Sequence, residues 1–251
     1  MRRRFFIDSF DSNSATMRGS TAEHLGRVLR AEPGQLYELS DGSNVWLARI
    51  ERLALSKRGE NQIDFTLVEP IAFRESSLDL VLLVSLVKFD RFEWCLEKAT
   101  ELGVNEIIPL AAARTDKPLL AASWKRRDRW ERILLESAQQ SRRLRAPVLR
   151  APVPPSEAFA RSSADRKLIL SERREAPSLR EALSHSATPA TLASQSSAAL
   201  AIGPEGGWTE DEIAAALSVG FSEASLGENI LRTETAVLAA LAIMRFAFSA
   251  D

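Results

Sequence analysis

The sequence predicts an α/β protein in which a small β-rich region precedes a larger domain built on a largely parallel sheet. Two observations lead to this prediction. After residue 77, apolar strand-like runs alternate with segments of helical periodicity, the order typical of a parallel α/β sheet. Before residue 71, short alternating runs are separated by turn signals instead. Of the 251 residues, 45% are hydrophobic and 27% charged, the balance of a globular protein with a core.

The first seventy residues predict a small barrel-like domain. The stretch "GQLYELSDGSNVWLARIERLA" (34–54) places Asp41-Gly42 between two alternating runs, which is typical of a β-hairpin. "NQIDFTLVEP" (61–70) predicts a further strand. We expect a linker from Glu69 to Ser77, before the short alternating runs give way to apolar strands and helical segments.

The next segment begins the α/β pattern. "LDLVLLVSLVK" (78–88) is a nearly continuous apolar run, which indicates a strand buried on both faces. "RFEWCLEKATELG" (91–103) predicts a helix that Gly103 ends, and "NEIIPL" (105–110) the next strand. A second helix is predicted from Ser123 to about Arg143.

The last third repeats the alternation of strand and helix. In order, we expect a strand at 167–171, a polar Ala/Ser-rich stretch to about 197, a strand at 198–203, a helix from Thr209 to Gly220, a short strand at 223–227 and a final helix at 232–248.

Composition narrows the function classes. The single cysteine, Cys95, excludes an intrachain disulfide, and one cysteine with two histidines argues against a metal cluster, so we expect no metal and place Cys95 in the core. "MRRRFFIDSF" lacks the apolar segment of a signal peptide, because Asp8 interrupts it. The longest apolar run, 236–244, is too short to span a bilayer. We therefore expect a cytoplasmic protein without membrane contact.

The charge is unevenly distributed along the chain. The net charge is −1, which gives no global attraction to nucleic acid. Residues 114–150, however, hold 11 Lys/Arg against 4 Asp/Glu, and residues 201–251 hold 2 against 8. A basic segment in a neutral chain suggests an anionic partner at one place, and a solvated basic helix explains it equally well.

The sequence "GPEGG" (203–207) ends a predicted strand just before a predicted helix. In open α/β sheets, ligands bind at this end of the strands, and glycine lets a ligand approach the backbone. The stretch is neither a P-loop nor the dinucleotide fingerprint G-x-G-x-x-G. Taken alone, it is better interpreted as an ordinary tight turn.

A second loop of the same kind changes that interpretation. "LGENILRTETA" (226–236) again runs from a short strand through a glycine into a helix, so two such loops could wall one pocket. Glu234 fits the first turn of a helix, where a negative charge complements the helix dipole. Arg232 is harder to explain structurally, because helix N-termini disfavour cations.

Four motifs in order carry a resemblance to a known family: "KFDRFEWCLEKATELGVNEIIPL", "ESAQQSRRLRAPVL", "IGPEGGWTEDEI" and "LGENILRTETA". Together they resemble the 16S ribosomal RNA uridine-N3 methyltransferases of the SPOUT class, and "HLGRVLRAEPG" (24–34) extends the resemblance to nearly the whole chain. The resemblance implies a PUA-like β-barrel for RNA in residues 1–72 and a trefoil-knotted methyltransferase domain in residues 73–251. It also implies a homodimer, S-adenosylmethionine as cofactor, and 16S rRNA of the small ribosomal subunit as partner.

The resemblance also assigns site residues. Arg232 would stabilise the charge that develops on the uracil carbonyls or grip a nearby phosphate, and Glu234, Glu205 or water would take the N3 proton. Lys88, Arg114, Arg143 and Arg30 would contact RNA. The cofactor pocket would be lined by Leu170, Ile202, Gly203, Glu205, Gly206, Gly207, Leu226, Gly227, Ile230, Leu231 and Arg232.

Two departures from the family pattern and two alternative functions remain. Arg142 stands where the family usually has glycine, which predicts a different bend at that helix end, and Asn229 stands where it usually has a basic residue. The alternatives are a SPOUT enzyme acting on another RNA or on a ribose 2′-hydroxyl, and a non-catalytic rRNA-binding assembly factor. The second alternative predicts a damaged glycine turn or a missing Arg232. The sequence shows neither defect, because the glycine turn is intact and Arg232 is present.

Overall fold

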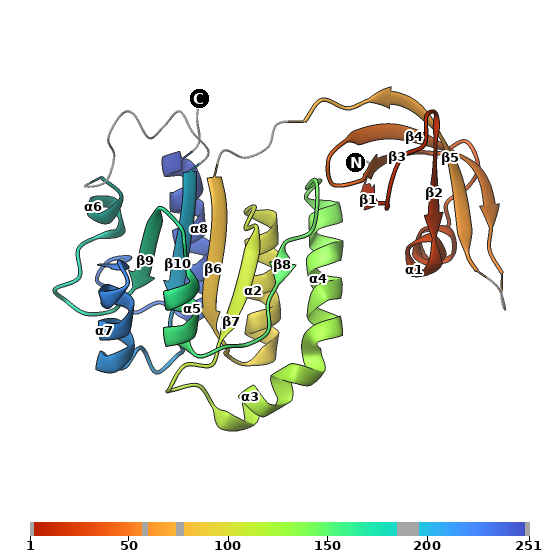
Figure 1. The fold of residues 1–251 in the computed structure, drawn as a ribbon. Coiled ribbons are helices and arrows are strands. Elements are labelled where there is room, and N and C mark those ends of the chain that lie inside the picture. The colour runs from red at the N-terminus through yellow and green to blue at the C-terminus, as the bar shows by residue number, and fades with distance from the viewer. Residues whose placement is uncertain (1–2, 57–59, 74–77, 185–195, 249–251) are drawn as a thin grey trace. The chain divides into compact units, whose positions relative to one another are not determined.

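The computed structural model describes residues 3–56, 60–73, 78–184 and 196–248. The chain forms two compact units (Figure 1). The first unit comprises Met1–Glu75 together with Ala138–Ala146, and the second comprises Ser76–Ser137 and Pro147–Asp251. A short piece of chain from the middle of the sequence therefore belongs with the N-terminal unit.

The first unit is a curved five-stranded sheet (Figure 1). Its strand order is β1-β3-β4-β5-β2, in which β1 pairs with β3 in parallel and every other pair is antiparallel. The elements are β1 (Arg4–Phe6), β2 (Ser14–Arg18), α1 (Gly19–Glu23) with a π-helical turn at His24–Val28, β3 (Leu36–Ser40), β4 (Val45–Ala54) and β5 (Gln62–Pro70).

The hairpin predicted at Asp41-Gly42 is confirmed and joins β3 to β4. The Asp41 carboxylate accepts the amide hydrogens of Ser43 and Asn44 at 2.8 and 2.7 Å, which fixes the turn. Irregular register between β4 and β5 bends the sheet around its apolar core, as bulges do. Of the predicted linker, residues 69 and 70 belong to β5, and 74–77 lie outside the described residues.

The second unit is a six-stranded sheet of order β11-β9-β10-β6-β7-β8. Every strand pair is parallel, so the predicted parallel sheet is confirmed. The strands are β6 (Leu78–Ser85), β7 (Glu106–Leu110), β8 (Val148–Leu149), β9 (Arg166–Leu170), β10 (Ser196–Ile202) and β11 (Ser222–Ala224). The helices are α2 (Phe89–Glu101), α3 (Lys117–Ser123), α4 (Arg127–Gln140, of which residues 138–140 belong to the first unit), α5 (Pro155–Arg161), α6 (Leu179–Ser184), α7 (Glu210–Ser218) and α8 (Thr233–Phe248).

Helices cover both faces of this sheet (Figure 1). On β6, Leu82 packs into the core shared with α2 and α8, while its neighbour Leu83 packs into the core shared with α5 and α7. Because successive side chains point to opposite faces, both must be apolar. This explains the continuous apolar run of β6.

The helix predicted from Ser123 to about Arg143 is wrong at its start and three residues too long at its end. Ser123 ends α3, which begins six residues earlier with Pro118 in its first turn, where proline is tolerated. A 3-10 turn then leads into α4, which ends at Gln140. Helices α5 and α6 and strand β8 were not predicted from the sequence, and residues 185–195 of the predicted polar stretch lie outside the described residues.

Helix ends with clear local signals were predicted correctly. Thr209 caps α7 in a capping box with Glu212, and Gly103 follows α2 with a φ of +81°. Where residues are described, no helix combines the length and apolar character needed to cross a membrane. The same residues hold no group of three or more His, Cys, Asp or Glu side chains that could bind a metal ion.

Candidate active-site pocket

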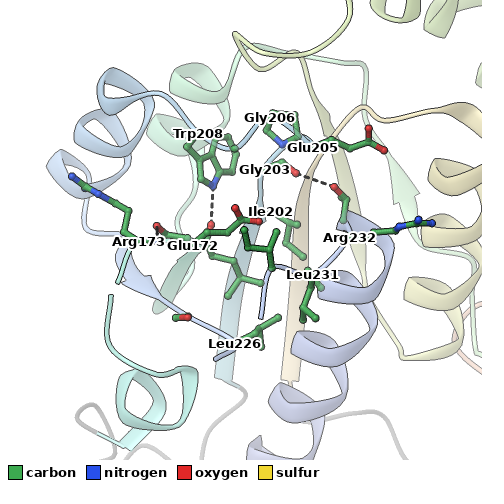
Figure 2. A pocket seen from close by; sticks show the side chains of 18 of the residues that line it. Glu172, Arg173, Ile202, Gly203, Glu205, Gly206, Trp208, Leu226, Leu231 and Arg232 are labelled. Carbon is green, nitrogen blue, oxygen red and sulfur yellow. Dashed lines mark hydrogen bonds between the residues drawn. The ribbon is translucent and has the colours of Figure 1, made fainter. Parts of the chain in front are cut away.

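Three loops of the second unit line one pocket of about 500 Å³ (Figure 2). The loops follow β9, β10 and β11, which are neighbours in a parallel sheet, so their carboxyl ends meet at one edge. The lining comprises residues 170–173, 202–208 and 225–233, with Arg114, Glu210, Ile213 and Ala236. All eleven residues predicted to hold a cofactor, from Leu170 to Arg232, are in this lining.

The glycine turn after β10 is held by a tryptophan. A Cβ added to Gly203 would lie 3.0 Å from Cε2 of Trp208, so the indole packs directly on the bare backbone. Trp208 Nε1 donates a 2.8 Å hydrogen bond to the carbonyl of Leu170, drawn as a dashed line from Trp208 in Figure 2. The ring of Trp208 also meets Phe159 edge-on. The indole thus ties the end of β9 to the turn after β10, in the packing role predicted for it.

Arg114 braces the same turn from the other side. Its Nη1 donates to the carbonyls of Gly206 and Trp208 at 2.7 and 3.1 Å. Gly207 has a φ of +71°, a conformation that side chains rarely adopt, and its amide donates to the Pro204 carbonyl at 2.8 Å. These glycines are therefore required by the loop itself, and Arg114 has a structural role besides the RNA contact predicted for it.

The third loop supplies the apolar rim. Gly227 has a φ of +118°, and Ile230 is 78% exposed at the pocket. Thr233 Oγ1, at the start of α8, lies 3.4 Å from the Gly203 carbonyl and links this loop to the glycine turn. An apolar side chain left this exposed beside a pocket is available to a ligand.

Arg232 lies where α8 begins and its side chain is exposed. Within the described part of the chain, its guanidinium makes no hydrogen bond or ion pair with another side chain. Figure 2 shows it directed away from Leu226 and Trp208, on the side of the view to which Glu205 also points. A cation at a helix N-terminus with no internal partner is available to an anionic ligand.

Glu205 and Glu234, the two candidate bases, both contact Arg91, which was not among the predicted site residues. Arg91 Nη1 is bonded to Oε1 of Glu205, and its Nε lies 3.7 Å from Oε1 of Glu234. Glu205 lines the pocket, whereas Glu234 does not. Arg91 stands in the first turn of α2, so the signal used for Arg232, a cation at a helix N-terminus, would also have identified it.

Cys95 is a buried core residue of α2, as predicted. Burial, and then the negative charge of Glu234, raise the pKa of the Cys95 thiol to about 12. The thiol is therefore protonated and inert at neutral pH. Oε2 of Glu234 is buried and has no hydrogen-bond partner among the described residues.

The four residues predicted to bind RNA are divided between the units. Lys88, exposed before the first turn of α2, and Arg114 belong to the second unit. Arg30 and Arg143 belong to the first. Arg30 is exposed with a φ of +52°, and Arg143 is half-buried just after α4.

The geometry defines a class of protein. A parallel α/β sheet whose strand ends form a glycine-lined pocket, with an arginine at its rim that has no side-chain partner among the described residues, is the arrangement of a protein that binds a small ligand. Residues 74–245 match the family of RNA methyltransferase domains. The chain belongs to this RNA methyltransferase family.

Several known proteins are similar over most of the chain. The ribosomal RNA small subunit methyltransferase E of Synechocystis is 36% identical over 91% of this chain and 72% of its own length. The crystal structure of the Neisseria gonorrhoeae enzyme of the same name, bound to S-adenosyl methionine, has a TM-score of 0.81 at 31% identity. A Legionella pneumophila methyltransferase, in complex with the same cofactor, also gives 0.81, at 30% identity. Each of these two similarities covers 98% of this chain and 98% of the chain in the solved structure.

Proposed function

We propose that this protein transfers a methyl group from S-adenosylmethionine to N3 of a uridine in 16S rRNA of the small ribosomal subunit. The observation that carries the proposal is the meeting of three loops in one pocket, with Arg232 unpartnered among the described residues at its rim. The similar proteins support the proposal, since they are named as small-subunit rRNA methyltransferases or hold this cofactor.

The residues of the pocket fit the cofactor chemically. Leu226, Ile230 and Leu231 offer apolar surface to an adenine ring, and residues 203–207 of the glycine turn line the same pocket. The exposed carboxylates of Glu172 and Glu228 also line the pocket and suit a ligand with positively charged groups. When bound, S-adenosylmethionine supplies a methyl group on a sulfonium centre that is electrophilic without further activation.

The protein's own task is to orient uridine and to remove its N3 proton. Loss of that proton spreads negative charge over the two flanking carbonyl oxygens, and a fixed guanidinium beside them stabilises it as it develops. We assign this role to Arg232. Of the candidate bases, Glu205 lines the pocket and is exposed, so we assign proton acceptance to its carboxylate.

Glu234 then has a positioning role. It does not line the pocket, and its carboxylate faces Arg91, which is also bonded to Glu205. Arg91 held between two carboxylates restricts the side chain of Glu205. Water remains the alternative proton acceptor, and a Glu205→Gln variant decides between them: an unchanged rate would favour water.

We further propose that residues 1–72 are a PUA-like RNA-binding domain and residues 73–251 a trefoil-knotted SPOUT domain. Lys88, Arg114, Arg143 and Arg30 would contact RNA phosphates, which attract cationic side chains whatever the base sequence. A homodimer is part of this proposal, and the exposed apolar side chains of Leu238 and Phe246 on α8 offer it a surface. The rRNA substrate would place the reaction in the cytoplasm.

The test is a methyl-transfer assay with labelled S-adenosylmethionine and small ribosomal subunits that lack the modification. The rRNA is digested and its nucleosides are identified by mass. Label in 3-methyluridine is the expected result. Label in another base or in a 2′-O-methyl nucleoside would overturn the substrate and keep the enzyme class. Binding of rRNA without cofactor binding or label would favour a non-catalytic assembly factor.

A further inference from the structure

The chain leaves α4 through a turn that fixes its direction. The amide of Arg143 donates a 2.9 Å hydrogen bond to the carbonyl of Ala138, and Arg142 between them has a φ of +55°. This is the helix ending in which glycine is usually found at the left-handed position. Arg142 therefore keeps the turn that a glycine would make, and the different bend expected from it is absent here.

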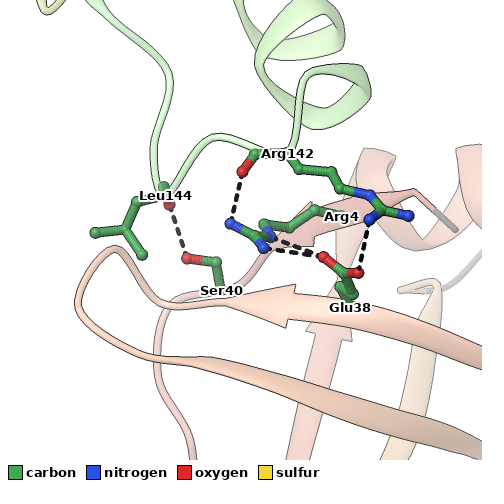
Figure 3. Close-up of polar contacts among 5 residues, drawn as sticks. All are labelled: Arg4, Glu38, Ser40, Arg142 and Leu144. Carbon is green, nitrogen blue, oxygen red and sulfur yellow. Dashed lines mark hydrogen bonds and ion pairs between the residues drawn. The ribbon is translucent and has the colours of Figure 1, made fainter. Parts of the chain in front are cut away.

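Two side chains of the curved sheet hold the backbone beyond this turn (Figure 3). Arg4 Nη1 donates to the carbonyl of Arg142 at 2.6 Å, and Ser40 Oγ donates to the carbonyl of Leu144 at 2.7 Å. Both contacts lie within the first unit, to which residues 138–146 belong. The two anchored carbonyls stand on either side of Arg143 in the chain.

The groups that make these contacts are buried. Arg4 is 5% exposed, Glu38 7% and Ser40 0%. Arg4 gives Nε and Nη2 to Oε2 of Glu38 at 3.1 and 2.9 Å, which leaves Nη1 for the Arg142 carbonyl. A buried guanidinium is costly when its donors lack partners, and the Arg142 carbonyl gives a partner to Nη1, while Nε and Nη2 bond Glu38. Glu38 also has Arg142 Nη1 3.7 Å from its other oxygen.

We infer that Arg4, Glu38 and Ser40 form a clamp that positions Arg143 for contact with the phosphate backbone of rRNA. The clamp fixes the backbone before and after Arg143, which reduces the ordering that its side chain must undergo on binding. None of the three clamp residues need touch RNA, so they are positioning residues that act through Arg143. The inference rests on the proposed function, in which Arg143 contacts RNA.

The test compares Ser40→Ala and Arg4→Lys with a matched control in the full-length protein. Ser40→Ala removes one anchoring hydrogen bond. Arg4→Lys keeps a positive charge beside Glu38 and so preserves the buried charge balance. It lacks the planar guanidinium that bonds Glu38 and the Arg142 carbonyl together. Thr16→Ala is the control. Thr16 lies on β2, at the opposite edge of the sheet from β1, and its hydroxyl also makes one hydrogen bond, to Asp64 at 3.4 Å.

Each clamp variant should raise both KM and Kd for unmodified small ribosomal subunits about three- to ten-fold, with kcat and cofactor affinity unchanged. Thr16→Ala should leave KM and Kd unchanged. The decisive measurement repeats Ser40→Ala in an Arg143→Ala background. If the clamp acts through Arg143, Ser40→Ala adds no further loss there.

An equal loss in both backgrounds would overturn the inference, as would an unchanged affinity in Ser40→Ala or in Arg143→Ala. A lower melting temperature alone, with KM and Kd unchanged, would show a merely structural role and would also overturn it. Failure of the wild-type protein to transfer methyl would instead overturn the proposed function. In that case the same comparison of Kd values still decides the role of the clamp.

Discussion

Substituting Gly203 by alanine should disturb the pocket by moving one aromatic ring. The added Cβ would lie 3.0 Å from Cε2 and 3.1 Å from Nε1 of Trp208, closer than ordinary van der Waals contact. The indole is held by its 2.8 Å hydrogen bond to Leu170 and by its edge contact with Phe159. It must therefore shift by a few tenths of an ångström against both restraints. Overpacking of this kind costs about 1–3 kcal/mol.

Two measurements follow the perturbation. The free energy of unfolding should fall by that amount in denaturant titrations, and the melting temperature by about 2–4 °C for each kcal/mol. Titration calorimetry should show weaker binding of S-adenosylmethionine to Gly203→Ala, because the displaced indole shifts the turn that lines the pocket.

A double-mutant cycle identifies the cause. Trp208→Ala removes the ring atoms nearest to the new Cβ, so Gly203→Ala should cost less than half as much in that background. The single Trp208→Ala variant is the reference for the lost ring and its hydrogen bond to Leu170. An equal cost in both backgrounds would refute the argument that Trp208 makes this position require glycine.

Three further predictions concern the side chains around the pocket. Arg232→Ala should lower kcat about 10²–10³-fold in single-turnover assays while the melting temperature stays unchanged; an unchanged rate would exclude Arg232 from catalysis. Arg91→Ala should lower kcat about 10- to 100-fold by releasing Glu205, with partial recovery in Arg91→Lys, and equal activity of both variants would contradict this. Burial raises the pKa of Cys95 from its ordinary value of 9 to about 12, so its contribution to stability is full below pH 9 and lost as pH rises toward 12. Between pH 9 and 10.5 the wild-type protein should lose more unfolding free energy than Cys95→Ala, and parallel curves would contradict this.

Features with strong local signals were predictable from the sequence. The capping box of Thr209 and Glu212 and the helix end at Gly103 depend on residues within a few positions of one another. The pocket was predictable because parallel strands place their carboxyl ends at one edge, so loops far apart in sequence converge there. The lining by the loops that contain Gly203 and Gly227 follows from this rule.

Features that depend on tertiary contacts were not predictable. The sharing of Arg91 by Glu205 and Glu234 joins three separate elements, and no local pattern pairs them. The clamp joins β1 and β3 to a turn more than a hundred residues away in sequence, as the Arg4 contact with Arg142 shows. The start of α3 is a different case, because Pro118 in its first turn is a local signal from which the helix start is predictable.

The central claim is that the pocket containing Arg232 directs methyl transfer to N3 of uridine. A methyl group on N3 occupies the base-pairing edge and stops reverse transcription, whereas methylation of the ribose hydroxyl leaves that edge free. Unmodified small subunits should therefore be treated with wild-type protein or Arg232→Ala, and their rRNA reverse-transcribed. The account predicts one new stop, at a uridine, after wild-type treatment and its loss with Arg232→Ala. Methyl incorporation without a stop, or an equal stop with both proteins, would contradict it.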